Sequence, residues 1–113
     1  MIKIENLCAG YEKKQILYDI SLSVPKGTLI SVIGPNGSGK STLLKSTIGI
    51  INPSEGTVII DDIDTKSMTQ REIAMKTSYL AQGKGAPDMT VEQMVLHGRF
   101  PYLSYPRRYS DND

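Results

Sequence analysis

The residues of this 113-residue chain whose types and spacing best suit chemistry form a glycine-rich segment, GPNGSGKS at 34–41. The segment fits the pattern G-x-x-x-x-G-K-S/T, in which backbone amides surround phosphate oxygens. Gly34, Gly37 and Gly39 let the backbone come close to a ligand, because they carry no side chain that would block the amides. The pattern predicts a phosphate-binding loop, and the alternative is a glycine-rich turn that binds nothing.

Polar side chains in and after this loop have predicted roles. Lys40 would supply an ammonium group to the β- and γ-phosphates, and the Ser41 hydroxyl is the expected protein ligand of Mg²⁺. Thr42 can reach a phosphate through its hydroxyl or its amide. Asn36 and Ser38, inside the loop, complete the predicted binding set.

The elements on either side of the loop must hold it in place. Residues 29–33 are nearly all apolar and rich in β-branched types, which predicts a buried strand leading into the loop. After Lys40 the spacing of Leu43, Leu44 and Ile48 is helical, and Pro53 ends the pattern. We therefore expect an amphipathic helix whose first residues belong to the loop.

Alternating apolar residues predict further strands. Residues 2–8 and 16–24 have the pattern of an antiparallel pair, and residues 57–60 that of a short strand. Residues 77–81 predict another strand, which leads into a loop at 82–87. The α and β patterns together indicate an α/β fold.

Two helices are expected to begin at capping boxes, one from Thr69 to Glu72 and the other from Thr90 to Gln93. His97 lies one residue before Gly98, where a helix that starts at Thr90 would end. A basic side chain is favoured at that position without any catalytic role.

Composition limits the function classes. Thirteen basic and twelve acidic residues leave a net charge of +1, so bulk charge does not direct the chain to nucleic acid or lipid. Cys8 is the only cysteine, the sequence after Met1 has no leader pattern, and no apolar run approaches the about 20 residues that span a bilayer. We expect a reducing, cytoplasmic setting.

The string GPNGSGKST at 34–42, with Tyr11 at the end of the first strand and Gln82 at the end of a later one, resembles the ATP-binding subunit of ABC transporters. The resemblance extends over all 113 residues. It implies ATP and Mg²⁺ as cofactors, Tyr11 as the ring that stacks on adenine, and Gln82 as the residue that reaches Mg²⁺ and the attacking water. Lys40 and Gln82 are the implied catalytic residues. An ordinary strand tyrosine and a solvated loop glutamine are the alternatives.

The resemblance also implies a P-loop NTPase-like mixed sheet with an N-terminal antiparallel β subdomain. Residues 1–33 would hold that β part and the strand before the loop. Residues 34–89 would hold the phosphate loop, its helix, β elements and the glutamine loop. Residues 90–113 would begin a helical subdomain, all within one ATP-binding domain.

The segment MTVEQMVLHGRFPYL at 89–103 looks closest to the branch that imports iron chelates, such as siderophores or haem, and the related corrinoid vitamin. The implied partners are transmembrane permease subunits and a second copy of the subunit, at the inner face of the cell membrane. No nucleic-acid partner is expected. Residues that adapt to a partner helix would form the docking groove: Met89, Met94, Phe100, Tyr102 and Tyr105. The alternative is that Met94 and Leu96 pack inward on their own helix.

ABC ATPases hydrolyse ATP with further parts: an LSGGQ-type segment, a carboxylate strand, the loop after it and a switch histidine. None occurs in these 113 residues. Asp61-Asp62 resembles the acidic pair that ends the carboxylate strand of this family. It lies only about twenty residues after Lys40, whereas the family's carboxylate strand comes much later, so the pair is interpreted as a turn. His97 is likewise not interpreted as the switch histidine. We expect the N-terminal portion of a longer subunit, with an incomplete sheet that self-associates and an ATP site that does not hydrolyse ATP.

Other functions remain open at this point. A soluble ABC ATPase that acts on DNA or ribosomes shares the loop, as does a kinase of small molecules. A non-catalytic nucleotide-binding fragment is the third alternative.

Overall fold

The computed structural model describes residues 1–83, 85 and 87–113. Lys84 and Ala86, which belong to the predicted loop at 82–87, lie outside the described residues.

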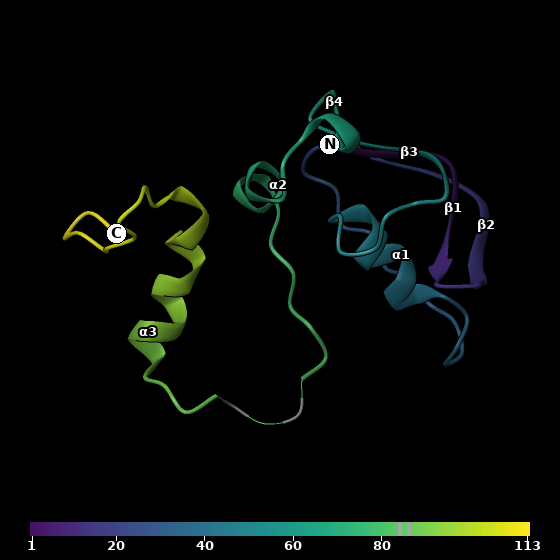
Figure 1. Ribbon diagram of the computed structural model, residues 1–113. Helices are drawn as coiled ribbons and strands as arrows, with labels where there is room; N and C mark the ends of the chain where they lie inside the picture. The colour runs from purple at the N-terminus through teal and green to yellow at the C-terminus, as the bar shows by residue number, and fades with distance from the viewer. Residues whose placement is uncertain (84, 86) are drawn as a thin grey trace.

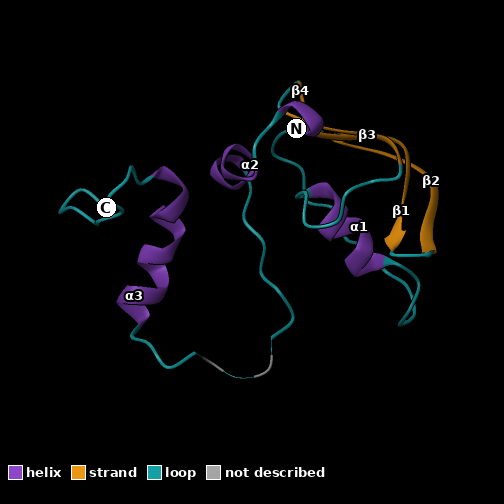
Figure 2. Cartoon of the chain, in the orientation of Figure 1, coloured by secondary structure: helices purple, strands orange, loops and turns teal. Residues whose placement is uncertain are grey.

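The strands form one antiparallel sheet with the order β2-β1-β3-β4, which lies on the side of the molecule opposite α3 and the C-terminus (Figures 1 and 2). Its strands are β1 (Ile2–Tyr11), β2 (Lys14–Val24), β3 (Glu55–Ile60) and β4 (Ile63–Asp64). The predicted antiparallel pair is confirmed, with both strands reaching further toward the connecting turn than expected. The short strand before Asp61 is confirmed as well.

One face of this sheet supplies the hydrophobic core. Leu7 and Ala9 are fully buried, and Val58 is 1% exposed. The remaining members of the cluster are Ile4, Leu17, Ile60 and Ile73. Burial of such side chains is the main favourable contribution to folding, so the core lies between the sheet and the helices that cover this face.

The helices are α1 (Lys40–Thr47), α2 (Gln70–Lys76) and α3 (Val91–Leu96), with 3₁₀ helices η1 (Thr65–Ser67) and η2 (His97–Tyr102). Both predicted capping boxes form. Thr69 and Glu72 cap α2 reciprocally, and Thr90 and Gln93 do the same for α3. These local signals are reliable here because each cap satisfies amides that the helix itself leaves unpaired.

Helix α1 differs from the expected amphipathic pattern. Its buried residues are Thr42, Ser46 and Thr47, whereas Leu44 is 47% exposed. The Ser46 hydroxyl donates to the Thr42 carbonyl at 2.7 Å, and the Thr47 hydroxyl donates to the Leu43 carbonyl at 2.9 Å. Because these hydroxyls are paired within the helix, small polar residues can be buried without an unsatisfied group.

The strand predicted at 29–33 does not form, which corrects the expectation of a buried strand before the loop. Residues 28–35 have no regular secondary structure, and the side chains of Leu29 and Ile33 are each 93% exposed. A β-branched run becomes a strand only when neighbouring strands supply hydrogen bonds and a surface to cover. In the part of the chain that the structure describes, no segment pairs with residues 29–33.

The strand predicted at 77–81 does not form either, and Leu80 is 97% exposed. The segment runs as an extended connection from α2 toward α3, as Figure 1 shows. The same physical reason applies, since no described strand lies beside it to complete a ladder.

The turn at Asp61 and Asp62 is confirmed. Both residues have left-handed backbone angles, with φ of 48° and 66°, and they join β3 to β4. The N-terminal ammonium donates to the Asp61 carboxylate at 3.1 Å, and Lys76 lies 3.6 Å from it. The ammonium in particular lowers the pKa of the Asp61 carboxyl below its ordinary value.

The C-terminal segment is attached to the rest through α2. Arg71 donates to the carbonyls of Pro101 at 2.6 Å and Leu103 at 3.2 Å, and the Tyr102 hydroxyl donates to the Met75 carbonyl. Across residues 1–83, 85 and 87–113, no helix has both the length and the apolar character needed to cross a bilayer.

Candidate functional site

A pocket of about 330 Å³ lies where the end of the β1–β2 hairpin meets the start of α1. The pocket, here called the loop pocket, is lined by Tyr11, Ile16, Asn36, Gly37, Gly39, Lys40, Ser41, Thr42 and Gln82. Its volume is at the lower end of the roughly 300–1,000 Å³ typical of small-molecule sites. The structure therefore brings the predicted aromatic residue, most of the predicted loop and the predicted glutamine around one space.

The loop that forms one wall of this pocket is shaped by short backbone contacts. The Ser38 amide donates to the Pro35 carbonyl at 3.2 Å, and the Leu43 amide donates to the Gly39 carbonyl at 2.9 Å. Gly39 is the N-cap of α1 and makes no side-chain capping bond. The amides of the first turn therefore have no partner within the helix, and the positive end of the helix dipole points the same way.

Position 39 favours glycine for two reasons, its backbone angle and the short distance to neighbouring side chains. Its φ is 101°, in the left-handed region, and a Cβ placed there would lie 2.9 Å from Leu17 Cδ2 and 3.2 Å from Ile16 Cγ2. The loop thus packs directly on β2 where a larger residue would push it away. This contact fixes the start of α1 against the hairpin.

Lys40 lies across the mouth of its own loop. Its ammonium donates to the carbonyls of Gly34 at 2.6 Å and Pro35 at 2.7 Å, and lies 3.4 Å from the Ser38 hydroxyl. These partners are neutral, and no salt bridge joins Lys40 to a carboxylate of the described residues. The positive charge of Lys40 is therefore not neutralised by these partners and is able to bind an anion.

The hairpin supplies the other wall. Tyr11 ends β1 and is 44% exposed, so part of its ring is open to a ligand. Ile16 lies half-buried on β2 and was missed by the sequence reasoning. A signal was present, because Ile16 is the first apolar residue after the polar stretch EKKQ at 12–15.

Two residues of the predicted binding set do not line the loop pocket. Gly34 and Ser38 face a neighbouring groove of about 290 Å³, together with Ile33 and Leu43. Their contribution to the loop is conformational, since a Cβ at Gly34 would lie 2.8 Å from the Ser38 hydroxyl oxygen. Gly34 and Ser38 therefore help to hold the loop in its conformation and are not part of the lining of the loop pocket.

The donor set fits a triphosphate with Mg²⁺. Unpaired amides, one ammonium and the hydroxyls of Ser41 and Thr42 all present positive charge or donors, which suits phosphate oxygens. Mg²⁺ commonly takes few protein ligands and completes its shell with phosphate oxygens and water. The side chains of Ser41 and Gln82 are among those that bring oxygen atoms to this pocket, together with Asn36 and Thr42. Over the described ranges, no group of three or more His, Cys, Asp or Glu residues is close enough to hold a metal ion.

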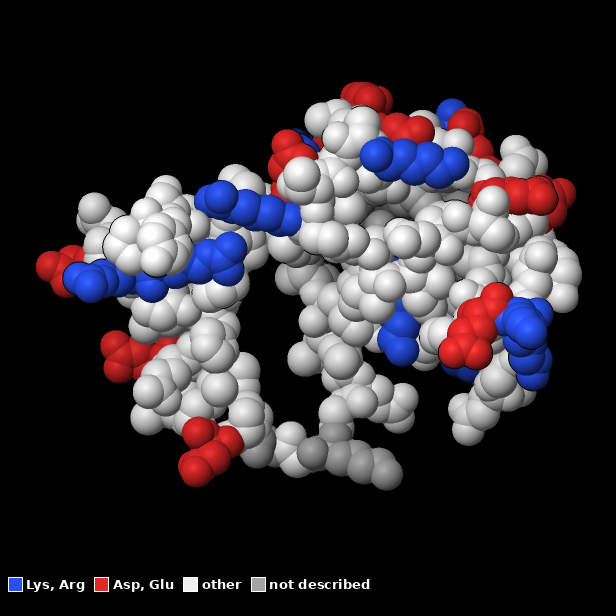
Figure 3. Space-filling view, in the orientation of Figure 1, with Lys and Arg blue, Asp and Glu red and all other residues white. Residues whose placement is uncertain are grey.

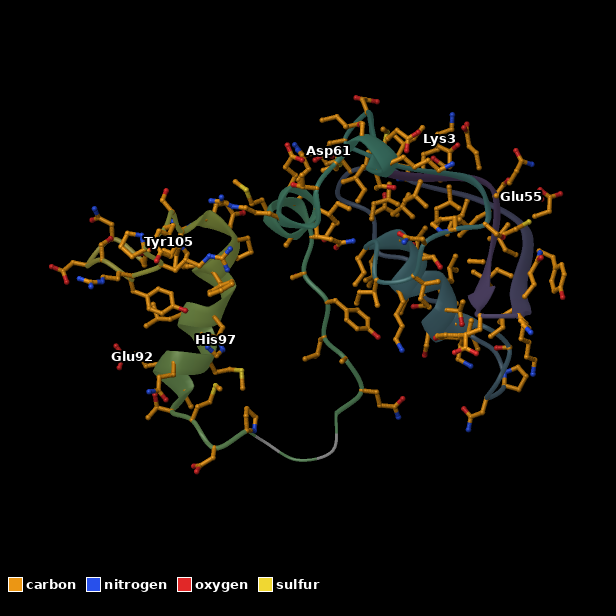
Figure 4. The ribbon with its side chains drawn as sticks, viewed as in Figure 1. Lys3, Glu55, Asp61, Glu92, His97 and Tyr105 are labelled. Carbon is orange, nitrogen blue, oxygen red and sulfur yellow. The ribbon has the colours of Figure 1, made fainter. Side chains whose placement is uncertain are left out.

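The acidic pair and the histidine that imitate catalytic residues lie elsewhere. Figure 4 shows Asp61 at the edge of the sheet and His97 where α3 ends and η2 begins, both away from the loop at the start of α1. Lys, Arg, Asp and Glu are interspersed on the face seen in Figure 3, without a single-sign patch over the sheet. The two interpretations of Asp61-Asp62 as a turn and His97 as a helix end agree with this placement.

Comparison with known proteins gives one consistent result. The sequence model described as ABC transporter matches residues 17–111. YusV of Bacillus subtilis (strain 168), a probable siderophore transport system ATP-binding protein, is 36% identical over 113 residues, with 99% of this chain and 41% of YusV covered. A probable metal transport system ATP-binding protein of Chlamydia pneumoniae is 40% identical, with 97% and 42% covered.

A solved structure is similar too. It is a dimeric ATP-binding cassette in a post-hydrolysis state bound to ADP and Pi, 34% identical with a TM-score of 0.58, over 66% of this chain and 34% of that one. The chain spans about two-fifths of the length of the curated relatives it matches, for example 41% of YusV.

Proposed function

Since this chain belongs to the ABC transporter family, we propose that it forms the nucleotide-binding part of an ATP-binding subunit that energises the import of a solute. In this proposal all 113 residues belong to one ATP-binding domain. Residues 1–33 contribute its β part, residues 34–89 the phosphate and glutamine loops, and residues 90–113 the start of a helical subdomain.

The observation that carries the proposal is the loop pocket, which unites Tyr11, the loop at 34–42 and Gln82. Tyr11 and Ile16 offer an aromatic and an apolar surface for adenine. The amides after Gly37, with the Lys40 ammonium, would hold the triphosphate. One molecule of ATP can engage both walls only because the hairpin and the loop meet here.

Ser41 and Gln82 would hold Mg²⁺ at the same place. When bound, Mg²⁺ supplies charge neutralisation at the β- and γ-phosphates. The Lys40 ammonium would leave the carbonyls of Gly34 and Pro35 and bind phosphate oxygens, with which it forms stronger, charge-assisted hydrogen bonds.

We propose ATP binding without hydrolysis for residues 1–113 themselves. No aspartate or glutamate is found among the described residues that line the loop pocket, so this lining holds no carboxylate that could accept a proton from the attacking water. In the whole protein, Lys40 and Gln82 are the proposed catalytic residues of ATP hydrolysis. Phosphate release from ATP by purified residues 1–113 should equal the buffer blank, and a rate above that blank would contradict this proposal.

The proposed cargo is an iron chelate. Support comes from the segment at 89–103 and from relatives such as YusV, named for a siderophore transport system. The similar Chlamydia pneumoniae protein is named for metal transport, and uptake of a metal ion is therefore the cargo class to compare.

The proposed partners are transmembrane permease subunits and a second copy of the ATP-binding subunit, at the inner face of the cell membrane. The aromatic and methionine side chains of the C-terminal segment are exposed, as a docking surface requires. They are Met89 (37%), Met94 (45%), Phe100 (46%), Tyr102 (43%) and Tyr105 (95%). The Arg107 guanidinium lies over one face of the Phe100 ring, 4.3 Å from the ring centroid.

The decisive experiment replaces the charge at the centre of the loop. Lys40→Ala should weaken the binding of Mg·ATP by at least tenfold in isothermal titration calorimetry, because it removes a charge-assisted contact worth about 1.5–3 kcal/mol. Lys45→Ala is the matched control, since it removes one positive charge from the same helix outside the loop pocket. Equal ATP affinity in the Lys40→Ala and Lys45→Ala proteins would overturn the proposed nucleotide site.

A further inference from the structure

A row of left-handed residues crosses three neighbouring strands in the middle of the sheet. Asp19 on β2 has a φ of 51°, Asn6 on β1 a φ of 48°, and Gly56 on β3 a φ of 86°. The Asn6 side-chain amide donates to the Asp19 carboxylate at 2.7 Å, and a Cβ at Gly56 would clash with the Asn6 carbonyl. We call these three residues the kink row.

The strand pairing changes register at this row. Between the pairs Ile4–Leu22 and Leu7–Ile20, β1 carries one extra residue, and between Leu7–Ile20 and Ala9–Leu17 the extra residue is on β2. These two bulges cancel, so the register of the Ile4–Leu22 pair returns at Ala9–Leu17. A third shift follows between Ala9–Leu17 and Gly10–Gln15, where β2 again carries the extra residue, so the tip of the hairpin is offset by one residue.

The pairing of β1 with β3 shifts at the same place, between the pairs Glu5–Thr57 and Cys8–Glu55. Three strands thus deviate together along one line.

The bulges keep the apolar side chains of β1 on the same face of the sheet before and after the register shift. Ile4, Leu7 and Ala9 are all buried although Ile4 and Leu7 are an odd number of residues apart. In an unbroken strand such a pair would point to opposite faces. Bulges also bend a strand and increase its twist. Figure 1 shows the hairpin of β1 and β2 turning away from the line of β3.

That hairpin end forms one wall of the loop pocket. Tyr11 lies at its tip, and Ile16 and Leu17 are the side chains on which Gly39 packs. We propose that the kink row is a positioning device, which directs the hairpin so that Tyr11 and Ile16 face the phosphate loop. This inference rests on the proposed function and deepens it, because it assigns adenine recognition to backbone geometry outside the pocket.

Asn6 and Asp19 are positioning residues in this proposal, since neither lines the loop pocket. Asn and Asp are the types, apart from glycine, that adopt left-handed angles most readily. Further hydrogen bonds stabilise the row. The Asn6 amide donates to the Ser21 hydroxyl at 3.0 Å, and the Asp19 amide donates to the Cys8 sulfur at 3.3 Å.

The test separates binding of the base from binding of the phosphates. Dissociation constants of magnesium ATP and magnesium tripolyphosphate are measured by calorimetry for the unsubstituted chain, Asp19→Val and Asp19→Gly. Valine strongly disfavours the left-handed angle, whereas glycine accepts it. Asp19→Val should weaken ATP binding about fivefold, the scale of a lost aromatic contact, and leave tripolyphosphate within about twofold. Asp19→Gly should keep both constants.

The matched control is Asp62→Val, which places the same strain on a left-handed aspartate in the β3–β4 turn, outside the loop pocket. It should preserve the ratio of the two constants. If circular dichroism shows that Asp19→Val does not fold, the milder Asp19→Ala variant is used in its place. Asp19→Ala should weaken the binding of magnesium ATP about twofold relative to the binding of magnesium tripolyphosphate.

Each other result counts against the inference. Equal weakening of both ligands by Asp19→Val would mean that the row acts through general stability and would overturn positioning. The positioning role would also be overturned if Asp19→Val had the same ratio of ATP to tripolyphosphate dissociation constants as the unsubstituted chain. If the unsubstituted chain bound neither ligand, the proposed function would fail, and this inference would fail with it.

Discussion

At the residue scale, the loop pocket depends on small and flexible groups. Gly39 brings the loop within van der Waals reach of Ile16 and Leu17, and Lys40 spans the loop with two hydrogen bonds to carbonyls. These roles follow from residue type, because only glycine allows the approach and only a long cationic chain reaches across. The loop residues that line the pocket could therefore be predicted from a contiguous pattern, although that pattern also includes Gly34 and Ser38, which do not line it. Ile16 could not, since its role arises from contact with Gly39 across the fold.

Tyr11 gives the prediction that belongs to this scale. Tyr11→Ala should weaken ATP binding by about twofold to tenfold, because an aromatic contact contributes about 0.5–1.5 kcal/mol beyond burial. Tyr11→Phe should retain most of the affinity, since the ring remains. Titration of each variant with ATP measures the effect.

Tyr105→Ala provides the control, because Tyr105 is 95% exposed and does not line the loop pocket. Identical affinities for the Tyr11→Ala and Tyr105→Ala proteins would show that Tyr11 is an ordinary strand residue.

At the element scale, helices with complete local signals formed as predicted. The capping boxes at Thr69 and Thr90 involve residues only three positions apart, so the sequence contains everything they need. Strands depend on partners that are distant in sequence. β1 and β2 form because a short turn joins them, whereas residues 29–33 and 77–81 have equal strand character and no partner in the described chain.

The capping box of α2 makes stability depend on pH. The Glu72 carboxylate accepts hydrogen bonds from the Thr69 amide at 2.6 Å and the Thr69 hydroxyl at 2.9 Å. These bonds, the amide first, lower the pKa of the Glu72 carboxyl in the folded state. A lowered folded-state pKa means that the stabilisation is present above the unfolded-state pKa and is lost as the pH falls through the folded-state pKa.

Glu72→Gln should therefore be less stable than the unsubstituted chain at pH 7, and the difference should disappear in acid. Urea unfolding followed by circular dichroism at a series of pH values measures it. Glu92→Gln is the matched control, an acidic residue in the first turn of α3, whose box is closed by Gln93. A difference between Glu72→Gln and the unsubstituted chain that persisted below pH 3 would contradict the proposed role.

At the scale of the whole molecule, several large apolar side chains are left uncovered. Leu29, Ile33 and Leu80 are each more than nine-tenths exposed. Ile33 also lines the apolar groove beside the loop, together with Leu17, Ile20 and Leu43. Exposed apolar surface of this kind favours association between chains.

Residues 1–113 should therefore self-associate in a concentration-dependent way, as measured by sedimentation velocity. Ile33→Lys should weaken the association by placing a charge in the apolar groove. Val91→Lys, a change at a residue that is 81% exposed on α3, should leave it unchanged. A monomer at every concentration would contradict the prediction.

The sequence alone determined the glycine-rich loop before α1, the helix caps, the antiparallel hairpin and the turn at Asp61-Asp62, because each arises from residues close together in the chain. The tertiary structure decided which apolar runs become strands, which face of α1 is buried, and that Ile16 joins the pocket. It also placed Asn6, Asp19 and Gly56 in one row. Such outcomes depend on partners far apart in sequence, and the pairing and packing that select them exist only once the chain has folded.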